Sequence, residues 1–301
     1  MQHTLKKTYT FSGTGLHTGI TANMKLHPAP AGSEIEFLRT DLGHDAFVRA
    51  LATNVGATAR STIIEANWVS VSTIEHLMSA AAGLGIDNML VEIDAPEVPI
   101  LDGSAKPYVE AICADGLEEQ DAPRRILRLK EPFHWEDAES GATIDILPGD
   151  EPKMELTIDF NSKVLGVQRF AYDGGVDYAT QIAPCRTFCF LHELEFMVSR
   201  GLVRGGDMDN AIVVVEQMIA PESLERMKKF FGVGDLEVRE GYLNNLELYF
   251  PDEIVRHKML DMIGDFALLG APLAGTIIAS KTGHRTNTAA CRSLLENNLV
   301  Y

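Results

Sequence analysis

A histidine and an aspartate stand four residues apart in the segment 256–265, as His257 and Asp261. In a helix these two side chains would share one face, with their Cβ atoms about 5–6 Å apart. That separation suits two ligands of one Zn²⁺ ion, whose bonds to nitrogen and oxygen are about 2 Å long. A hydrogen-bonded pair along a helix would show the same spacing. The pair therefore indicates a metal site only if a third ligand lies nearby.

His76 is a candidate for that third ligand, and Glu75 directly before it is a candidate for a general base. A catalytic zinc ion with three protein ligands keeps a position for water and lowers the pKa of that water to about 7. A carboxylate outside the ligand set could then accept the proton. The segment 72–75 also has the form of a capping box, in which Glu75 would bond to the backbone of Ser72. Both roles of Glu75 stay open at this point.

Two further histidines are placed to contact a substrate. His284 follows a Gly-bearing turn at the end of a predicted strand, where a loop histidine could donate a proton to a leaving amine or lie in solvent. His17 lies in a tight turn, where it could meet a substrate or have no role. The other five histidines have no neighbours that support a function: His3, His27, His44, His134 and His192.

Patterns typical of several other enzyme classes are absent from the sequence. There is no G-x-x-x-x-G-K-[ST] loop, no G-x-S-x-G elbow and no H-E-x-x-H pair. The Gly-Thr-Gly at 13–15 lacks the strand–helix context of a dinucleotide-binding turn. The four cysteines form no C-x-x-C pair, so any metal must be held mainly by histidine and carboxylate.

The segments around these residues show where the positioning elements lie. Residues 154–160 alternate apolar and polar side chains, which predicts a half-buried strand. Residues 221–231 carry opposite charges at helical spacing, which predicts a short amphipathic helix. The other predicted elements are helices that begin at residues 72 and 107, a helix over 252–269, and strands at 88–93, 211–215 and 275–279.

The two segments that carry the candidate ligands resemble each other weakly. In each, a histidine followed two residues later by methionine precedes a Leu-Gly pair and then a strand, at 76–85 and at 257–270. The repeat predicts two α+β halves of similar topology. Each half would present a helix to a shared interface, the kind of place where ligands bind preferentially.

Length and charge limit the domain count and the partners. The 301 residues suit two domains, and the polar, turn-prone segment 115–123 predicts a linker between domains 1–122 and 123–301. A net charge of −17 excludes a general affinity for nucleic acid or anionic lipid. We find no secretory signal and no apolar stretch long enough to span a membrane. We therefore expect a monomeric, cytoplasmic protein.

Taken together, these motifs resemble the family of UDP-3-O-acyl-N-acetylglucosamine deacetylases, the zinc amidases of bacterial lipid A synthesis. The matching segments occur in family order along nearly the whole chain. They are 15–19, 72–77, 83–88, 99–105, 186–190, 199–202 with Gly205 and Gly206, 255–261, and Gly283 and His284 with Asn287. The resemblance implies two domains, each a small sheet with two helices, packed with the helices face to face as a sandwich and the active site between them.

The resemblance also implies a role for each matching residue. The zinc ligands would be His76, His257 and Asp261, with Fe²⁺ as an alternative metal for the same ligand set. Glu75 would be the general base, His284 the acid that protonates the leaving nitrogen, Asp265 its orienting partner, and Thr187 a donor to the oxyanion. The substrate contacts would be His17, Lys258, Phe188 and Glu193, with Arg200 beside an acyl-chain passage that residues 154–160 and 164–167 help to build.

The function implied is hydrolysis of the N-acetyl amide of UDP-3-O-(3-hydroxyacyl)-N-acetylglucosamine, which releases acetate in the committed step of lipid A synthesis. A zinc amidase for another acylated amino sugar is an alternative, and so is a non-catalytic sugar-nucleotide binder, which would need neither Glu75 nor His284. Three features depart from the family pattern: a longer segment at 216–245, Asp207 in place of serine, and Arg285-Thr286 after His284.

Overall fold

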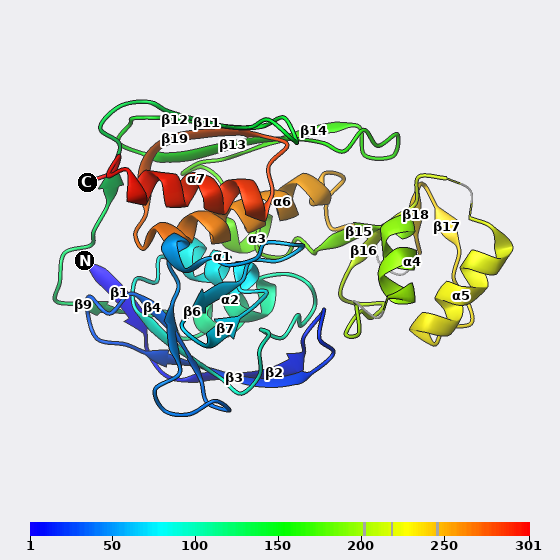
Figure 1. Cartoon of the computed structure of the whole chain (residues 1–301), viewed down its shortest axis with the longest axis horizontal. Coiled ribbons are helices and arrows are strands. Elements are labelled where there is room, and N and C mark those ends of the chain that lie inside the picture. Colours follow the sequence, from blue (N-terminus) through cyan, green and yellow to red (C-terminus); the bar gives the residue numbers. More distant parts are fainter. Residues whose placement is uncertain (201–202, 218, 245–246) are drawn as a thin grey trace.

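The computed structural model describes residues 1–200, 203–217, 219–244 and 247–301, apart from the side chain of Ser199. The family motif at 199–202 and the longer segment at 216–245 therefore lie partly outside the described residues. The protein is an α+β structure in which two sheets enclose a layer of helices, and a smaller lobe projects to one side (Figure 1). Within the described ranges, no helix is both long enough and apolar enough to cross a membrane.

The first sheet is built from residues before position 94. Its strand β8 lies between two hairpins, antiparallel to β3 and parallel to β4. In spatial order the sheet consists of β2 (Tyr9–Thr14), β3 (Thr21–Pro28), β8 (Met89–Ile93), β4 (Ile35–Arg39) and β5 (Phe47–Arg49). Alternate residues of β3 are buried, as expected for a sheet with one face on the core.

The second sheet repeats this topology. Its last strand β19 again lies between two hairpins, antiparallel to β12 and parallel to β13. In spatial order it consists of β11 (Phe133–Asp137), β12 (Ala142–Leu147), β19 (Leu273–Ser280), β13 (Pro152–Asp159) and β14 (Val167–Tyr172), with β10 (Leu127–Arg128) also paired to β19. The prediction of two α+β halves with similar topology is confirmed.

One boundary element differs from the sequence prediction. Residues Leu117–Gln120, within the predicted linker 115–123, form strand β9, which pairs with β1 (Gln2–Leu5). The prediction of a linker at 115–123 did not include this strand, because its partner β1 lies more than 100 residues away in the sequence. A two-stranded hairpin, β6 (Ile64–Ala66) and β7 (Val69–Val71), precedes the first central helix.

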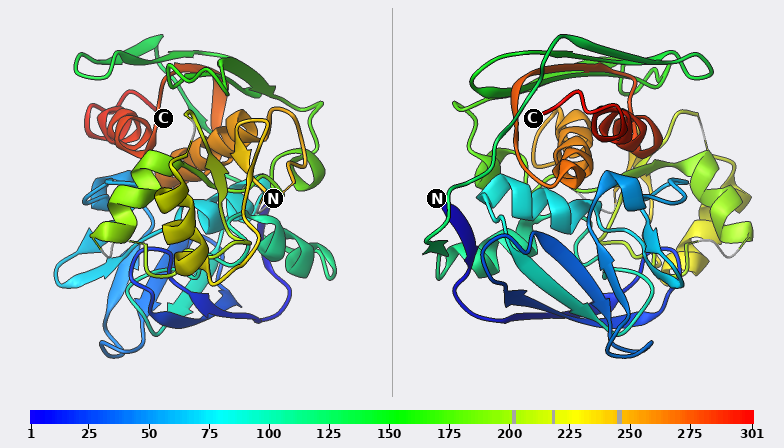
Figure 2. Two further views of the ribbon diagram at one scale, coloured as in Figure 1. Left: turned by 90° about the vertical axis from the view of Figure 1, so that its right-hand side faces the viewer. Right: turned by 60° about the vertical axis from the view of Figure 1, so that its left-hand side comes forward.

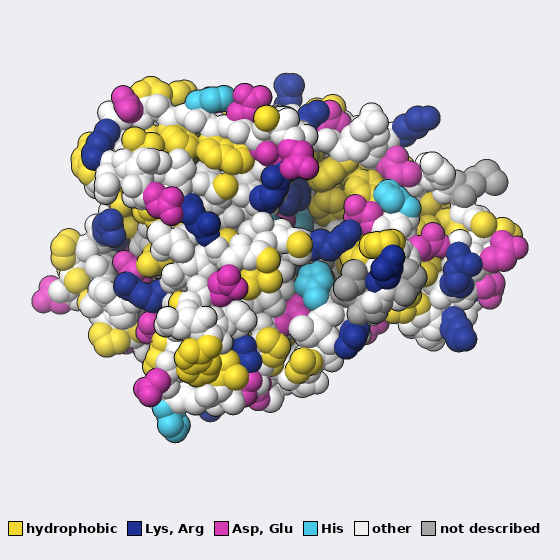
Figure 3. Space-filling model, viewed as in Figure 1, with side chains coloured by type: hydrophobic (Ala, Val, Ile, Leu, Met, Phe, Trp, Pro, Cys, Tyr) yellow, Lys and Arg dark blue, Asp and Glu magenta, His cyan; other side chains and the backbone are white. Residues whose placement is uncertain are grey.

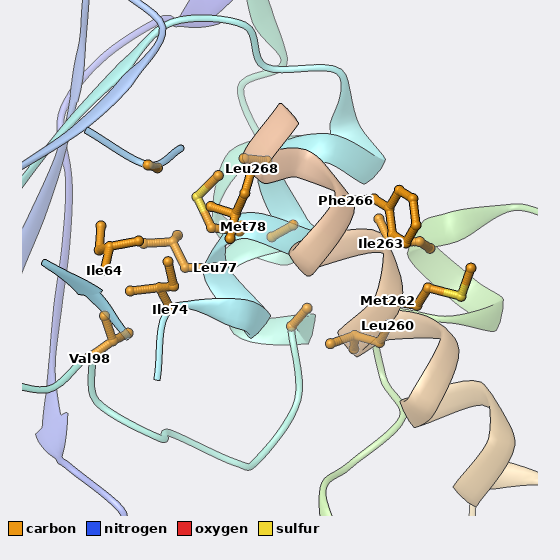
Figure 4. Packing of buried hydrophobic residues seen from close by; sticks show 14 of the residues in the cluster. Ile64, Ile74, Leu77, Met78, Val98, Leu260, Met262, Ile263, Phe266 and Leu268 are labelled. Carbon is orange, nitrogen blue, oxygen red and sulfur yellow. The ribbon is translucent and has the colours of Figure 1, made fainter. Parts of the chain in front are cut away.

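The helices lie between the two sheets, as both views in Figure 2 show. Two come from each half: α1 (Glu75–Leu84) and α2 (Lys106–Cys113), then α6 (Glu253–Phe266) and α7 (His284–Glu296). Figure 4 shows the buried apolar side chains around the α1–α6 crossing, with Leu77 directed towards Ile64, Ile74 and Val98. Burying a side chain of this kind contributes about 1.5–3 kcal/mol, so this layer is a main source of stability.

The helices α1 and α6 cross at Gly264, which has no side chain to hold them apart. A Cβ atom at this position would overlap the backbone carbonyl of Glu75 and lie 3.1 Å from the backbone nitrogen of Ser79. The first turn of α1 can therefore rest directly on α6. This contact brings the residues at 75–76 close to those of α6.

Gly264→Ala is expected to destabilise the protein, although alanine favours a helix by about 1 kcal/mol over glycine. The added methyl group meets backbone atoms that cannot rotate away, and overpacking of this kind costs about 1–3 kcal/mol. Thermal unfolding would measure the loss, with Gly174→Ala as control, because nothing lies within 4 Å of a Cβ atom at Gly174. Equal melting temperatures for the two variants would contradict this view of the crossing.

The lobe follows the helix α3 (Tyr178–Gln181) and has an apolar core of its own. It contains the strands β15 (Phe188–Phe190), β16 (Ile212–Val214), β17 (Val238–Arg239) and β18 (Tyr242–Leu243), and the helices α4 (Leu191–Ser199) and α5 (Pro221–Phe231). Its core includes Leu194, Met197, Val213 and Met227. The helix predicted at 221–231 is confirmed as α5, so the described part of the longer segment at 216–245 is folded into the lobe.

Candidate active site

Three side chains from the crossing helices form a group that could hold a metal ion. His76 comes from α1, and His257 and Asp261 come from α6. Their ligand atoms all lie within 4.8 Å of one another, and all three residues are buried. The Nε2 atoms of His76 and His257 lie 3.7 and 3.4 Å from Asp261 Oδ1. The three residues predicted from the sequence are therefore together, where the two halves of the chain meet.

The donor atoms fit a divalent metal. Among the described residues, Asp261 Oδ1 is buried and has no hydrogen-bond partner, although buried polar atoms are nearly always paired. His257 Nδ1 donates to the carbonyl oxygen of Cys185 at 3.0 Å, which leaves the lone pair of Nε2 directed at the group. Burial lowers the pKa of His76 to about 3 and also lowers the pKa of His257. Both imidazoles are therefore neutral at pH 7, which is the form that binds metal.

Asp261 is held as a carboxylate by its neighbours. Burial by itself would raise the pKa of Asp261, but the positive charges of Lys258 and His284 help to hold it below its usual range. Lys258 Nζ donates to Asp261 Oδ2 at 2.8 Å. Lys258, predicted as a substrate contact, is thus bonded to the carboxylate of the metal group.

Glu75 lies beside this group but does not cap its own helix. Helix α1 begins at Glu75 without a side-chain cap, and the Ser72 hydroxyl instead bonds to Pro96. Glu75 Oε2 accepts a hydrogen bond of 3.0 Å from the backbone N–H of Thr62. The capping-box interpretation was therefore wrong, because a more distant segment supplies the donor. Burial raises the pKa of Glu75 to about 7, so the carboxyl can both accept and release a proton near neutral pH.

His284 lies close to Glu75 and is paired with Asp265. Its Nδ1 lies 3.0 Å from Asp265 Oδ2, and its Nε2 lies 3.7 Å from Glu75 Oε1. Burial lowers the pKa of His284, but Asp265, Glu75 and Asp261 outweigh it and raise the pKa to about 9. His284 is thus a cation at pH 7, opposite a carboxyl whose pKa is near 7. Groups whose pKa values are separated in this way suit an acid–base pair.

His284 is the first residue of α7, so its predicted placement on a loop was wrong. The turn continues directly into the helix, because Thr286 Oγ1 accepts a hydrogen bond of 2.9 Å from the Gly283 N–H. Arg285 points outward and pairs with Asp137 and Glu139. The two residues that depart from the family pattern after His284 therefore have structural contacts: Thr286 caps α7, and Arg285 joins it to the second sheet.

A mostly apolar cavity opens beside the metal group, between the turn at 15–19 and the lobe. It contains three predicted residues, His17, Thr187 and Phe188, and the Phe188 ring centroid lies 6.4 Å from that of His257. His17 Nε2 is buried and has no hydrogen-bond partner in the part of the chain that the structure describes. The other lining residues are Leu16, Arg60, Cys189, Leu194, Met197, Val203, Gly206, Asp207, Asn210, Ala211, Val213 and Phe231.

A family model described as UDP-3-O-acyl N-acetylglycosamine deacetylase matches residues 2–231 and 236–296 of the chain. The chain belongs to this deacetylase family. It is 40% identical over 301 residues to a UDP-3-O-acyl-N-acetylglucosamine deacetylase of Myxococcus xanthus, covering all of this chain and 88% of that protein. It is 39% identical over 300 residues to the deacetylase of Mannheimia succiniciproducens, covering 98% of this chain and 90% of that one.

Other deacetylase relatives are longer proteins. The chain is 42% identical over 292 residues to the bifunctional enzyme LpxC/FabZ of Porphyromonas gingivalis, covering 97% of this chain and 63% of the relative. It is 38% identical to the corresponding enzyme of Bacteroides thetaiotaomicron, covering 97% of this chain and 64% of that relative. The chain thus spans slightly less than two thirds of these bifunctional members of the deacetylase family.

Two predicted substrate contacts of this deacetylase family member lie farther from the metal group, on helix α4 or at its end. The Glu193 carboxylate pairs with Arg60 at 3.6 Å, beside the cavity. The Arg200 side chain is exposed at the end of α4, where its guanidinium lies 5.3 Å from the centre of the Phe196 ring.

The residues predicted to help build the acyl-chain passage, 154–160 and 164–167, do not line this cavity, and Phe160 approaches it through the ring of Phe188, 5.5 Å away between centroids. Residues 154–160 form β13 and its end in the second sheet, and none of them lines the cavity. The described apolar wall comes instead from α4, β15, β16 and α5. Alternation along 154–160 correctly predicted a strand with one buried face, but it does not tell which apolar surface that face covers.

Thr62 and the Cys185 carbonyl are parts of the site that no sequence motif indicates. Thr62 bonds to Glu75 and Asp265, and the Cys185 carbonyl bonds to His257. Asn287 belongs to a matching family segment, and the structure shows that it donates to Asp265 Oδ2 at 2.9 Å. Thr62 has no local signal, since its partners lie 13 and 203 residues away.

Proposed function

We propose that this member of the deacetylase family hydrolyses the N-acetyl amide of UDP-3-O-acyl-N-acetylglucosamine and releases acetate, as the committed step of lipid A synthesis. The metal would be Zn²⁺, with Fe²⁺ as an alternative that the same ligand set accepts. One observation carries the proposal. The buried group of His76, His257 and Asp261 lies beside Glu75, whose carboxyl has a pKa near 7, and beside the protonated His284.

The chain's own residues supply the proton transfers of amide hydrolysis. A metal ion held by the three ligands would polarise the amide carbonyl and acidify a water molecule. Glu75 accepts the proton from the attacking water. His284, held by Asp265, donates a proton to the departing glucosamine nitrogen, which is a poor leaving group without one. The Thr187 hydroxyl supplies a donor to the oxygen on which negative charge develops.

The surroundings of the site match the two ends of such a substrate. The apolar cavity beside Phe188 is suited to an acyl chain, because its wall is built mainly from aliphatic and aromatic side chains. Figure 3 shows basic side chains and a histidine gathered between the lobe and the rest of the molecule, despite the net charge of −17. A local group of cations suits the anionic diphosphate. We propose His17, Lys258, Phe188 and Glu193 as contacts of the sugar nucleotide and Arg200 as a contact of the acyl part.

The function is tested by incubating the metal-loaded protein with UDP-3-O-acyl-N-acetylglucosamine and measuring acetate and the free amine by mass spectrometry. Substrates with several acyl-chain lengths and another N-acetylated, acylated amino sugar belong in the same assay. We expect the UDP-linked substrate to be deacetylated with the highest kcat/KM. Tight binding without acetate release would support a non-catalytic binder instead, and preference for the other amino sugar would overturn the substrate assignment.

Phe231→Ala is expected to shift the preference towards longer acyl chains. Phe231 ends α5, which lies far from the α1–α6 crossing in Figure 1, and its side chain lines the apolar cavity. One methylene in an apolar pocket changes kcat/KM by about 10–200-fold, so a shortened wall should alter the ratio between chain lengths by at least about tenfold. Competition between two substrates of different length would measure that ratio.

Leu224→Ala is the matched control, because Leu224 is also on α5 and packs on the lobe core but does not line the cavity. We expect this control to lower stability and to leave the chain-length ratio unchanged. If both variants changed the chain-length ratio equally, a general loosening of α5, and not the space left by the Phe231 side chain, would determine the chain-length preference.

The domain limits and the cellular context are also proposals. We propose domains at 1–122 and 123–301, because β9 returns to pair with β1 and β10 then joins the second sheet. We further propose that the enzyme acts as a monomer in the cytoplasm. Its four cysteines are all free, which agrees with a reducing compartment.

A further inference from the structure

Four residues around the metal group form a closed ring of polar contacts. Thr62, Glu75, Asp265 and His284 come from four different segments: the loop before β6, α1, α6 and α7. His284 links the two carboxyl groups on one side, through Nδ1 to Asp265 and with Nε2 at 3.7 Å from Glu75. Thr62 links the same two carboxyl groups on the other side.

Thr62 reaches each carboxyl group with a different donor. Its backbone N–H donates to Glu75 Oε2 at 3.0 Å, and its hydroxyl donates to Asp265 Oδ1 at 2.6 Å. Thr62, Glu75 and Asp265 are all buried, and Thr62 and Asp265 have no exposed surface. Hydrogen bonds from neutral donors to buried carboxyl groups are strong, because no water competes for the acceptor.

The hydroxyl of Thr62 completes the set of donors that orients Asp265. Asn287 Nδ2 holds Oδ2 at 2.9 Å, and His284 Nδ1 lies 3.0 Å from Oδ2 and 3.2 Å from Oδ1. Without the Thr62 hydroxyl, Asp265 Oδ1 would keep, within the described part of the chain, only the 3.2 Å contact to His284 Nδ1. The carboxylate could then rotate, and the His284 ring that it holds would lose its fixed direction.

We propose that Thr62 is a positioning residue. It holds the base Glu75 and the aspartate that orients the acid His284, Asp265, in a fixed arrangement beside the metal group. This inference rests on the proposed deacetylase function. It gives a role to Thr62, which lies outside all the sequence motifs named above. Thr62 acts through its two neighbours and does not itself exchange a proton with the substrate. Its effect is therefore on kcat, since the groups that it aligns act in the reaction and not in substrate binding.

The test compares Thr62→Val with Thr62→Ser in the metal-loaded enzyme. Valine has nearly the same shape and keeps the backbone N–H but removes the hydroxyl, whereas serine keeps the hydroxyl. Because small displacements of catalytic groups can cost a factor of about 100, we expect kcat of Thr62→Val to fall about 10- to 100-fold with little change in KM. Thr62→Ser should retain kcat within about threefold of the wild type.

Thr4→Val is the matched control for the loss of a buried threonine hydroxyl. Thr4 is also buried, and its hydroxyl donates to Asn88 at 2.8 Å, far from the site in strand β1. We expect Thr4→Val to lower the melting temperature and to leave kcat and KM unchanged. If Thr62→Val does not fold, Thr62→Cys replaces it, since a thiol is a weaker donor of similar size and should give an intermediate kcat.

Three results would overturn the proposal: unchanged kcat in Thr62→Val, equal losses of kcat in the valine and serine variants, or a loss confined to KM. Failure of the wild type to release acetate would overturn the proposed function instead. The Thr62–Asp265 link has a separate test in unfolding experiments on Thr62→Val, Asp265→Asn and the double variant. We expect the double variant to be no less stable than Asp265→Asn, and additive losses would contradict the link.

Discussion

Glu75→Ala is expected to bind one equivalent of metal but to lose a factor of about 10²–10⁴ in kcat, the usual contribution of a general base. Glu75 contacts Thr62 and His284 and is not part of the group of three ligands, so metal binding should not depend on it. Burial raises its pKa to about 7, which suits a group that takes a proton from water near neutral pH. Steady-state release of acetate and metal analysis of the same sample would measure both effects.

Glu110→Ala serves as the control for this change. Glu110 lies on α2 with an exposed side chain that pairs with Lys106, so its loss should leave kcat within experimental error. Near-normal turnover in Glu75→Ala would show that another group takes the proton. Loss of metal from Glu75→Ala would instead place the carboxylate among the ligands, and the assignment of three ligands would need revision.

Removal of the metal is expected to abolish acetate release, and stoichiometric Zn²⁺ should restore it. Asp261 Oδ1 and the Nε2 atom of His257 lie 3.4 Å apart with no donor from the described residues between them, an arrangement that a cation completes. His257→Ala should retain less than about a tenth of the metal of the wild type, because structural and catalytic sites lose affinity steeply when a ligand is deleted. Metal content by mass spectrometry and turnover would be measured after chelation and after re-addition.

His44→Ala is the matched control, since His44 is exposed and outside the metal group. It should bind metal and turn over like the wild type. Full activity after chelation, with metal analysis showing an empty protein, would rule out the metal mechanism. Re-addition of Fe²⁺ in place of Zn²⁺ under anaerobic conditions would then compare the two metals that this ligand set accepts.

Local patterns in the sequence predicted most of the elements that carry the site. The alternation at 154–160 corresponds to β13, and the apolar run at 211–215 corresponds to β16. The helix predicted over 252–269 is α6 followed by the 3-10 turn Ala267–Leu269. These predictions succeeded because the buried face of a strand or helix repeats within a few residues, and that period is visible in the sequence alone.

Predictions that depended on a terminus or on a distant partner failed. Residues 72–75 have the sequence of a capping box, but the backbone N–H that donates to Glu75 comes from Thr62 and not from Ser72. His284 was placed on a loop because the Gly-bearing turn at 282–283 resembles an end of structure, yet Thr286 caps a new helix there. In both places the competing hydrogen bonds have similar strength, so the tertiary context decides which one forms.

The residue types and their spacing were enough to predict the chemistry of the ligands and the pairing of His257 with Asp261, because residues four apart on a helix share a face. The tertiary structure alone decided which distant groups complete the site. His76 joins the other two ligands because Gly264 lets α1 rest on α6, and Thr62 joins Glu75 to an aspartate 203 residues away. Such contacts depend on how closely helices cross, and no local pattern of residues encodes that distance.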